Sequence, residues 1–143
     1  MIVLILGCGR VGALLATDLD REGHDVRVID QNPDSFQRLP LQFRGQILTG
    51  QGIDDEMLIR AGIDEAQVFA AVTNDDNTNI MASEVAKVIH HVPKVITRIY
   101  DPIREEAYQA FGLETVCPTA LGADLIENML NQAAAVKNDQ TGA

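Results

Sequence analysis

The chain has 143 residues, of which 46% are hydrophobic, 22% are charged and only 4% are aromatic. This length suits one globular domain with a buried core, and no apolar run reaches the roughly 20 residues that a membrane-spanning helix requires. The formal net charge of −10 argues against nucleic acid as a partner, because binding to a phosphate backbone requires a basic face.

Short β-branched runs alternate with longer amphipathic stretches along the chain. The pattern predicts strands over residues 1–6, 25–30, 46–49, 67–73, 94–99 and 115–117. It predicts helices over residues 10–22, 34–39, 54–61, 77–91, 102–111 and 120–135. Such alternation is typical of βαβ units. We therefore expect an α/β fold that is Rossmann-like and doubly wound, with a six-stranded, mainly parallel sheet and helices on both faces.

Local signals place several element boundaries. Gly23 is expected to end the first helix, and Pro33 to lie in the first turn of the second. Asp54 is expected to cap the third helix, and Asp101-Pro102 to begin the fifth. Residues 80–89 are apolar around most of a helix, which predicts cover on two sides, by other helices or by a second subunit. The polar segment 137–143 is expected to be a flexible tail.

The N-terminus opens directly into the first predicted strand, with no basic flank or cleavage site. We therefore predict no signal peptide. Cys8 and Cys117 do not make a disulfide framework, and this cysteine usage favours a reducing, cytoplasmic location.

A glycine-rich turn follows the first predicted strand and precedes the first predicted helix, which is the context that a dinucleotide-binding motif requires. Gly7 permits the tight turn, Gly9 allows the backbone to approach a pyrophosphate, and Gly12 allows close helix–strand packing. Backbone N–H groups and the helix dipole then favour phosphate binding. The turn predicts an adenine-dinucleotide site that comprises Gly7, Cys8, Gly9, Arg10, Val11 and Gly12.

Asp30 closes the second predicted strand, about 20 residues after the turn, where a carboxylate accepts hydrogen bonds from ribose hydroxyls. A carboxylate there repels a 2′-phosphate, and Gln31 and Asn32 supply no compensating arginine. We therefore expect NAD(H) or ATP/ADP and disfavour NADP. The alternative is that Asp30 caps a turn only.

Arg10 is unusual in such a turn, because the backbone amides already suffice for a pyrophosphate. An added guanidinium suits a ligand with more terminal charge, such as ATP or ADP, or a phosphate shared with a neighbouring subunit. The alternative is a solvent-exposed arginine in the first turn of the helix.

The later strand ends carry further candidate ligand contacts, because ligands of doubly wound sheets lie across the carboxyl ends of the strands. Gln51 stands between two glycines and offers its amide to an adenine edge. Thr73 and Asn74 are placed to meet the middle of a dinucleotide, and Arg98 to reach a phosphate or an acidic neighbour. The alternative makes these turn residues and one surface salt bridge.

The sequence gives little support for a catalytic or a metal-binding role. His90 and His91 end a predicted helix, where positive charge suits the dipole, and no third metal ligand is near in sequence. No Ser, His or Cys stands in a general-base arrangement, and the six strands leave nothing to build a substrate pocket. We therefore expect a nucleotide sensor and not an enzyme. The alternative function is the cofactor-binding domain of an NAD-dependent dehydrogenase.

These motifs together resemble the N-terminal nucleotide-binding domain of the regulators of potassium conductance, and most of all the cytoplasmic subunits of Trk-type potassium-uptake systems. The similarity covers residues 1 to about 120. The segments that carry it are Gly7–Gly12, Glu22–Val26, Val28–Asp30, Leu58–Ile63, Ala71–Asn79 and Thr97–Pro102.

The resemblance implies a regulatory subunit at the cytoplasmic face of the membrane, attached to a membrane potassium-transport subunit. It implies homo-oligomers, as dimers or rings, in which bound NAD(H) or ATP/ADP gates ion flow. By position, the ligand contacts would be Gly7 through Val11, Asp30, Thr73, Asn74 and Arg98. Residues 121–136 resemble the family's crossover helix, which packs on a partner subunit; the alternative is packing on its own sheet.

Two departures from the family pattern bear on the site. Gln51 stands where relatives often carry an acidic residue. Thr119 stands where some relatives have a glutamate that holds a metal between subunits, so no metal is predicted.

Overall fold

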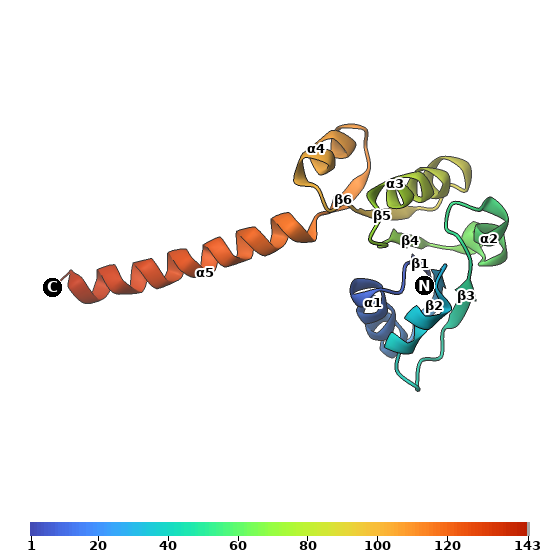
Figure 1. The fold of residues 1–143 in the computed structure, drawn as a ribbon, viewed down its shortest axis with the longest axis horizontal. Coiled ribbons are helices and arrows are strands. Elements are labelled where there is room, and N and C mark those ends of the chain that lie inside the picture. The colour runs from blue at the N-terminus through green and yellow to red at the C-terminus, as the bar shows by residue number, and fades with distance from the viewer. Residues whose placement is uncertain (143) are drawn as a thin grey trace.

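The fold was analysed in a computed structural model that describes residues 1–142 (Figure 1). Its sheet has six strands in the order β3-β2-β1-β4-β5-β6, and every neighbouring pair is parallel. This confirms the predicted fold class. The strands are β1 (Ile2–Leu6), β2 (Asp25–Asp30), β3 (Gln46–Thr49), β4 (Val68–Ala71), β5 (Lys94–Arg98) and β6 (Glu114–Val116).

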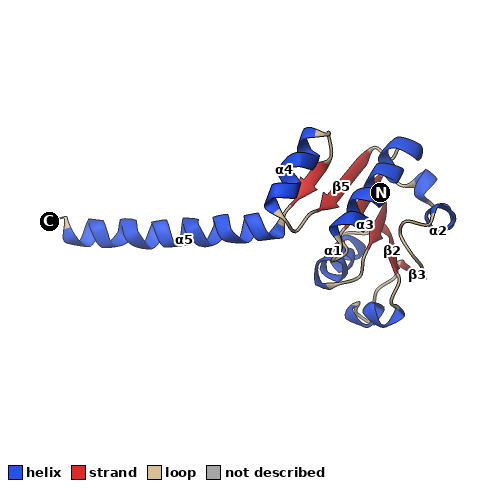
Figure 2. Cartoon of the chain, turned by 45° about the horizontal axis from the view of Figure 1, so that its top comes forward, coloured by secondary structure: helices blue, strands red, loops and turns tan. Residues whose placement is uncertain are grey.

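The helices connect the strands as crossovers (Figure 2). Several begin at the expected caps: the Asp54 carboxylate accepts from the Glu56 N–H, and the Asp101 carboxylate from the Ile103 N–H. The helical elements are α1 (Arg10–Arg21), the 3₁₀ helix η1 (Pro33–Arg38), α2 (Asp55–Arg60), the 3₁₀ turn η2 (Ile63–Glu65), α3 (Asp76–Glu84), its π-helical continuation η3 (Val85–Ile89), α4 (Pro102–Ala110) and α5 (Pro118–Thr141).

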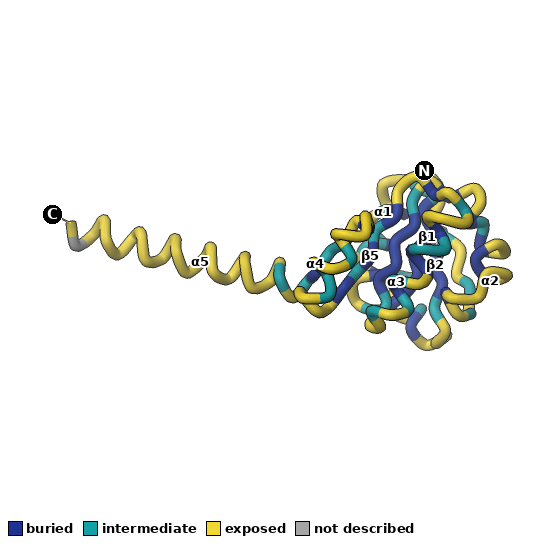
Figure 3. The backbone as a smooth tube through the Cα atoms, turned by 90° about the horizontal axis from the view of Figure 1, so that it is seen from above, coloured by how far each residue is buried: buried dark blue, intermediate teal, exposed yellow. Residues whose placement is uncertain are grey.

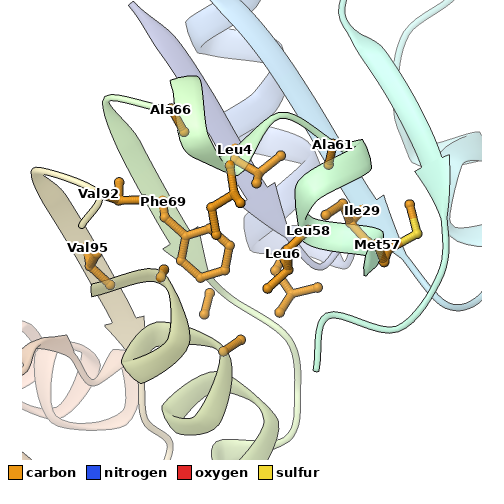
Figure 4. Close-up of a cluster of buried hydrophobic side chains, with 14 residues drawn as sticks. Leu4, Leu6, Ile29, Met57, Leu58, Ala61, Ala66, Phe69, Val92 and Val95 are labelled. Carbon is orange, nitrogen blue, oxygen red and sulfur yellow. The ribbon is translucent and has the colours of Figure 1, made fainter. Parts of the chain in front are cut away.

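The two faces of the sheet carry separate apolar clusters, because successive side chains of a strand point to opposite faces. Leu4 and Leu6 of β1 pack with Phe69 and with residues of α2 and α3 (Figure 4). Val3 and Ile5 of the same strand pack instead with residues of α1 and η1. Helices therefore cover both faces, as predicted.

The strand order reverses beside β1, which pairs with β2 on one side and with β4 on the other. The crossovers diverge at this point, so the loops after β1 and β4 leave a crevice at the carboxyl edge of the sheet. The glycine turn follows β1, and Thr73 lies just beyond β4.

His90 ends a helix, as predicted, and has a second role. Its Nδ1 lies 2.6 Å from an Asp64 carboxylate oxygen, and its Nε2 lies 2.6 Å from an oxygen of Asp55. Its side chain is only 7% exposed. The residue therefore ties the end of η3 to α2 and η2, through partners distant in sequence, in addition to ending a helix.

The last helix, α5, extends away from the sheet (Figure 1). The predicted end near residue 135 is wrong: the helix continues to Thr141, through most of the segment expected to be a flexible tail. Its polar residues are compatible with a helix, and neither Gly nor Pro occurs between residue 123 and Gly142. Residue 143 of that segment lies outside the described residues.

Residues 121–140 are exposed, so α5 does not pack on its own sheet (Figure 3). Its apolar stripe is open to solvent in the single chain and comprises Leu121, Leu125, Ile126, Met129 and Leu130. The apolar helix over residues 80–89 is covered on one side only, because Met81, Val88 and Ile89 are more than half exposed. Within residues 1–142, no helix combines the length and hydropathy needed to cross a membrane.

Candidate functional site

A pocket of about 730 Å³ opens at the carboxyl edge of the sheet, at the point where the strand order reverses. This is within the size range of small-molecule and cofactor sites. Nine of the predicted site residues line it, namely Gly7, Gly9, Arg10, Val11, Asp30, Gln51, Thr73, Asn74 and Arg98. The structure therefore brings together residues from the carboxyl ends of five strands, β1 to β5.

The glycine turn has the geometry that its sequence predicts. Gly7 has φ +106°, a conformation that L side chains rarely adopt, and its N–H donates to the Ile29 carbonyl at 2.7 Å. A Cβ on Gly12 would overlap the carbonyl oxygen of Gly7, so glycine is required for close packing there. A Cβ on Gly9 would meet no atom within 4 Å. Gly9 thus faces open space, and α1 begins with no side-chain cap on its first N–H groups.

Cys8 and Gly12 were predicted as ligand contacts, but neither lines the pocket. The Cys8 side chain is fully buried in the cluster beneath α1, and its N–H already donates to Asp30 Oδ2 at 2.7 Å. Burial, followed by the charge of Asp30, raises the pKa of the Cys8 thiol to about 11, although Arg38 acts in the opposite direction. Both residues therefore shape the turn and do not face the pocket, and the Cys8 thiol stays protonated at neutral pH.

Asp30 is both a turn residue and part of the pocket lining. Its Oδ1 accepts from the Asn32 N–H at 2.8 Å, which makes a local turn, while its Oδ2 holds the glycine turn through Cys8. It also lines the pocket, and carboxylate oxygens retain further lone pairs for ligand hydroxyls. The same side chain can therefore position the turn and accept from a ribose.

Asn79 organises the opposite side of the pocket and was missed as a site residue by sequence reasoning. It is fully buried in the first turns of α3. Its Oδ1 accepts from the Thr73 N–H at 3.0 Å and from the Thr73 hydroxyl at 2.6 Å. Its Nδ2 donates to the carbonyls of Thr73 and Arg98, both at 3.0 Å. One amide thus holds the ends of β4 and β5 at a fixed separation.

Arg98 does not pair with an acidic neighbour among the described residues, and its contact with a phosphate stays a prediction. It makes no ion pair with the described residues; Nη2 donates to the Tyr100 hydroxyl at 2.6 Å, and the guanidinium lies 4.2 Å from the Tyr100 ring centre. Its buried Nε has no hydrogen-bond partner. The guanidinium lines the pocket and keeps donor capacity for an anion. Tyr100, which sequence reasoning also missed, lines the pocket beside it.

The two glycines beside Gln51 are explained by packing. A Cβ on Gly50 would overlap the Met57 side chain, and one on Gly52 would overlap Leu6. Both glycines therefore leave room for these two side chains, whether or not a ligand approaches them. Gln51 lines the pocket, as expected, and its contact with adenine stays a prediction.

The pocket lining combines backbone groups with charged side chains of both signs. Among the described residues, its lining includes no histidine, cysteine or lysine. Over residues 1–142, no three His, Cys, Asp or Glu side chains are arranged to hold a metal ion. What the lining offers is a glycine turn, two acidic residues (Asp30 and Asp75), and three arginines, Arg10, Arg38 and Arg98.

The sequence is similar to a known protein family and to curated relatives. The family model described as the TrkA-N domain matches residues 3–119. The chain is 49% identical over 124 residues to the Trk system potassium uptake protein TrkA of Streptomyces coelicolor. The matched region covers 87% of this chain and 56% of that protein. A Trk system potassium uptake protein TrkA homolog of Pyrococcus abyssi is 37% identical over 111 residues, covering 76% of this chain and 48% of the relative. The chain thus spans about half the length of these curated relatives.

Solved structures agree with this assignment. The GsuK channel bound to NAD superposes with a TM-score of 0.78 at 26% identity, over 94% of this chain and 24% of that chain. The structure of GsuK bound to ADP superposes with a TM-score of 0.77 at 26% identity, over 92% of this chain and 34% of that chain.

Proposed function

The chain belongs to the TrkA-N domain family, and from this premise we propose that it is the nucleotide-sensing part of a regulatory subunit of a Trk-type potassium transport system. One observation carries the proposal. The glycine turn, Asp30, Thr73 and Arg98 line a single pocket at the reversal of the strand order, in a chain 49% identical to a Trk system protein.

The ligand we propose is NAD(H) or ATP/ADP. The open space at Gly9 suits the approach of a pyrophosphate, and Asp30 suits a ribose. Arg10 makes no hydrogen bond or ion pair within the described residues, and the buried Nε of Arg98 has none either. These groups fit the negative charge of a nucleotide. The NAD and ADP complexes of GsuK support the same choice.

The proposed mode of action is regulatory. Nucleotide binding at the carboxyl edge would change the arrangement of a homo-oligomer attached to a membrane potassium-transport subunit, on the cytoplasmic side of the membrane. The exposed apolar stripe of α5 supports this, since the sheet of this chain leaves the stripe uncovered and exposed apolar patches mark interaction surfaces. We assign α5 as the crossover and dimerisation helix.

Calorimetric titration with NAD, NADH, ATP, ADP and AMP tests the proposal. A ligand shifts a conformational equilibrium only through different affinities for the two states, so the nucleotides should bind with clearly different affinities and change the oligomer measured by light scattering. Equal, weak binding of all five contradicts a switch. A matched variant, Asp30→Ala, should weaken every adenosine ligand.

We propose that the chain is not an enzyme. A dehydrogenase requires a proton donor or acceptor at the bound nicotinamide. The described pocket lining contains no histidine, cysteine or lysine, and its Asp75 and Tyr100 side chains are engaged in capping α3 and in a hydrogen bond with Arg98. Spectrophotometric assay of NADH oxidation with a panel of small carbonyl compounds should show no turnover. Turnover would favour the dehydrogenase alternative.

A further inference from the structure

Two arginines of the chain are left without partners, and both line the pocket. Most of the eight arginines hold a partner within the protein, for example Arg27 with Asp25 and Arg104 with Asp76. Arg10 and Arg38 make no hydrogen bond or ion pair with any residue of the part of the chain that the structure describes. The chain has 21 acidic residues and only 11 basic ones, so acidic partners outnumber the arginines, and yet these two arginines are unpaired. Each unpaired guanidinium keeps its five N–H donors for a ligand.

Arg38 stands on the ribose side of the pocket. It ends η1, the helix that follows directly after β2 and Asp30. Gln31, Asn32 and Ser35, from the same segment after β2, also line the pocket. Phe36 and Leu39, on either side of Arg38 in sequence, pack into the cluster beneath α1. The backbone that carries Arg38 is therefore anchored by the core, while its side chain remains free to meet a ligand.

The charges of Asp30 and Arg38 act on the same part of the molecule. Both influence the pKa of the buried Cys8 thiol, which Asp30 raises and Arg38 lowers. The expectation that NADP is disfavoured rested on the lack of an arginine at Gln31 and Asn32. That premise is incomplete, because the fold brings Arg38 to this pocket from further along the chain.

We propose that Arg38 is a specificity-determining residue that lets the ribose end of the pocket accept a phosphate on the adenosine ribose beside Asp30. The inference rests on the proposed nucleotide binding. The Asp30 carboxylate accepts from free ribose hydroxyls, and the Arg38 guanidinium pairs with a ribose phosphate when one is present. The pocket therefore accepts NADP as well as NAD, and the discrimination between them depends on Arg38.

The test compares ligands that differ only in the ribose phosphate. NAD against NADP, and 5′-AMP against adenosine 2′,5′-bisphosphate, are titrated calorimetrically into the wild-type chain and Arg38→Ala. We expect the variant to lose about tenfold more affinity for each 2′-phosphorylated ligand than for its unphosphorylated counterpart. Arg38 is exposed and makes no internal contact through its charge, so the thermal midpoint should not change.

Arg21→Ala is the matched control, because Arg21 is an exposed arginine of α1 outside the pocket lining. It should leave all four affinities unchanged. Equal losses for both members of each pair in Arg38→Ala would mean that Arg38 contacts the shared part of the ligand, which overturns the inference. Unchanged affinities, or wild-type binding of NAD without NADP, also overturn it. A wild-type chain that binds none of the four ligands would instead remove the proposed function itself.

A second variant tests the balance of charges directly. Asp30→Asn keeps an acceptor for the Cys8 N–H but removes the negative charge, so it should raise affinity for NADP relative to NAD. That gain should disappear in the double variant Asp30→Asn, Arg38→Ala. A gain that persists without Arg38 would contradict a phosphate contact by this side chain.

Discussion

The two halves of the pocket are built in different ways. The half after β1 and β2 depends on backbone conformation and on one carboxylate, Asp30, which bonds to amides of its own turn and of the glycine turn. The half after β4 and β5 depends on a buried side chain, Asn79, which bonds to Thr73 and Arg98. The first half is thus a local property of two turns, whereas the second exists only once α3 has packed on the sheet. We expect mutations to separate the two accordingly.

The largest effect is expected at Asn79, in the second half. Asn79→Ala removes the Asn79 partner of the Thr73 N–H and of the carbonyls of Thr73 and Arg98, while the Thr73 hydroxyl keeps its contacts with Asp75. The loss should lower the free energy of unfolding by about 3 to 5 kcal/mol. Urea denaturation measures the loss. Asn77→Ala, an exposed asparagine on the same helix, is the control and should cost less than about 1 kcal/mol. Equal effects of the two variants would remove the organising role of Asn79.

In the first half, substitutions of two glycines should have different effects, one on stability and the other on nucleotide affinity. Gly12→Ala forces a methyl group against the backbone of Gly7 and should destabilise the chain by about 2 to 3 kcal/mol. Gly9→Ala meets no atom within 4 Å, so it should leave the unfolding midpoint nearly unchanged while it weakens nucleotide binding. Thermal unfolding and calorimetry on both variants check this, and a Gly9→Ala variant with wild-type affinity would contradict a phosphate at the turn.

Asp30→Ala should reduce affinity for adenosine ligands about tenfold to a hundredfold, because ribose hydroxyls lose a charged acceptor. Calorimetry with AMP isolates this effect, since AMP carries no second nucleotide half. Asp30→Asn should retain part of the affinity and the bond to Cys8. If AMP affinity is unaffected in Asp30→Ala, Asp30 serves the turn only.

The smallest effect is expected at His90. This residue links the end of η3 to α2, the helix that follows the Gln51 loop. Burial alone would lower the pKa of His90, but hydrogen bonds to Asp55 and Asp64, and their charges, outweigh burial and raise the pKa above 6.5. A raised pKa in the folded state means that protonation stabilises the fold. This stabilisation is fully present below the unfolded pKa of about 6.5 and is lost as pH rises through the folded value.

Unfolding measured across that pH range should therefore show a decline for the wild-type chain that is absent in His90→Gln. At pH 6 the variant should be less stable by about 1 kcal/mol, a modest value because both carboxylates are mostly exposed. His24→Gln is the control: His24 lies between α1 and β2, where it contacts the N-terminal amine and Glu22 and neither aspartate. Parallel pH profiles for wild type and His90→Gln would exclude the proposed tie.

The contrast between the halves also explains what could be predicted from sequence. The glycine turn and Asp30 follow from local patterns, because backbone geometry and a neighbouring carboxylate need only a short segment. The pairing of His90 with Asp55 and Asp64, the four bonds of Asn79, and the arrival of Arg38 in the pocket depend on contacts between elements distant in sequence. Sequence patterns within single elements do not predict such long-range contacts. Composition alone underestimates the length of α5, because the polar residues that predict a flexible tail are equally compatible with a helix.

Hydrogen–deuterium exchange with NAD and with AMP tests most directly whether one nucleotide lies across both halves. NAD should slow exchange in residues 7–12 and in residues 73–79, because it extends from the glycine turn to the ends of β4 and β5. AMP should protect the first segment and leave the second nearly unchanged. Protection by NAD that is confined to one segment, or absent from both, would contradict a shared site.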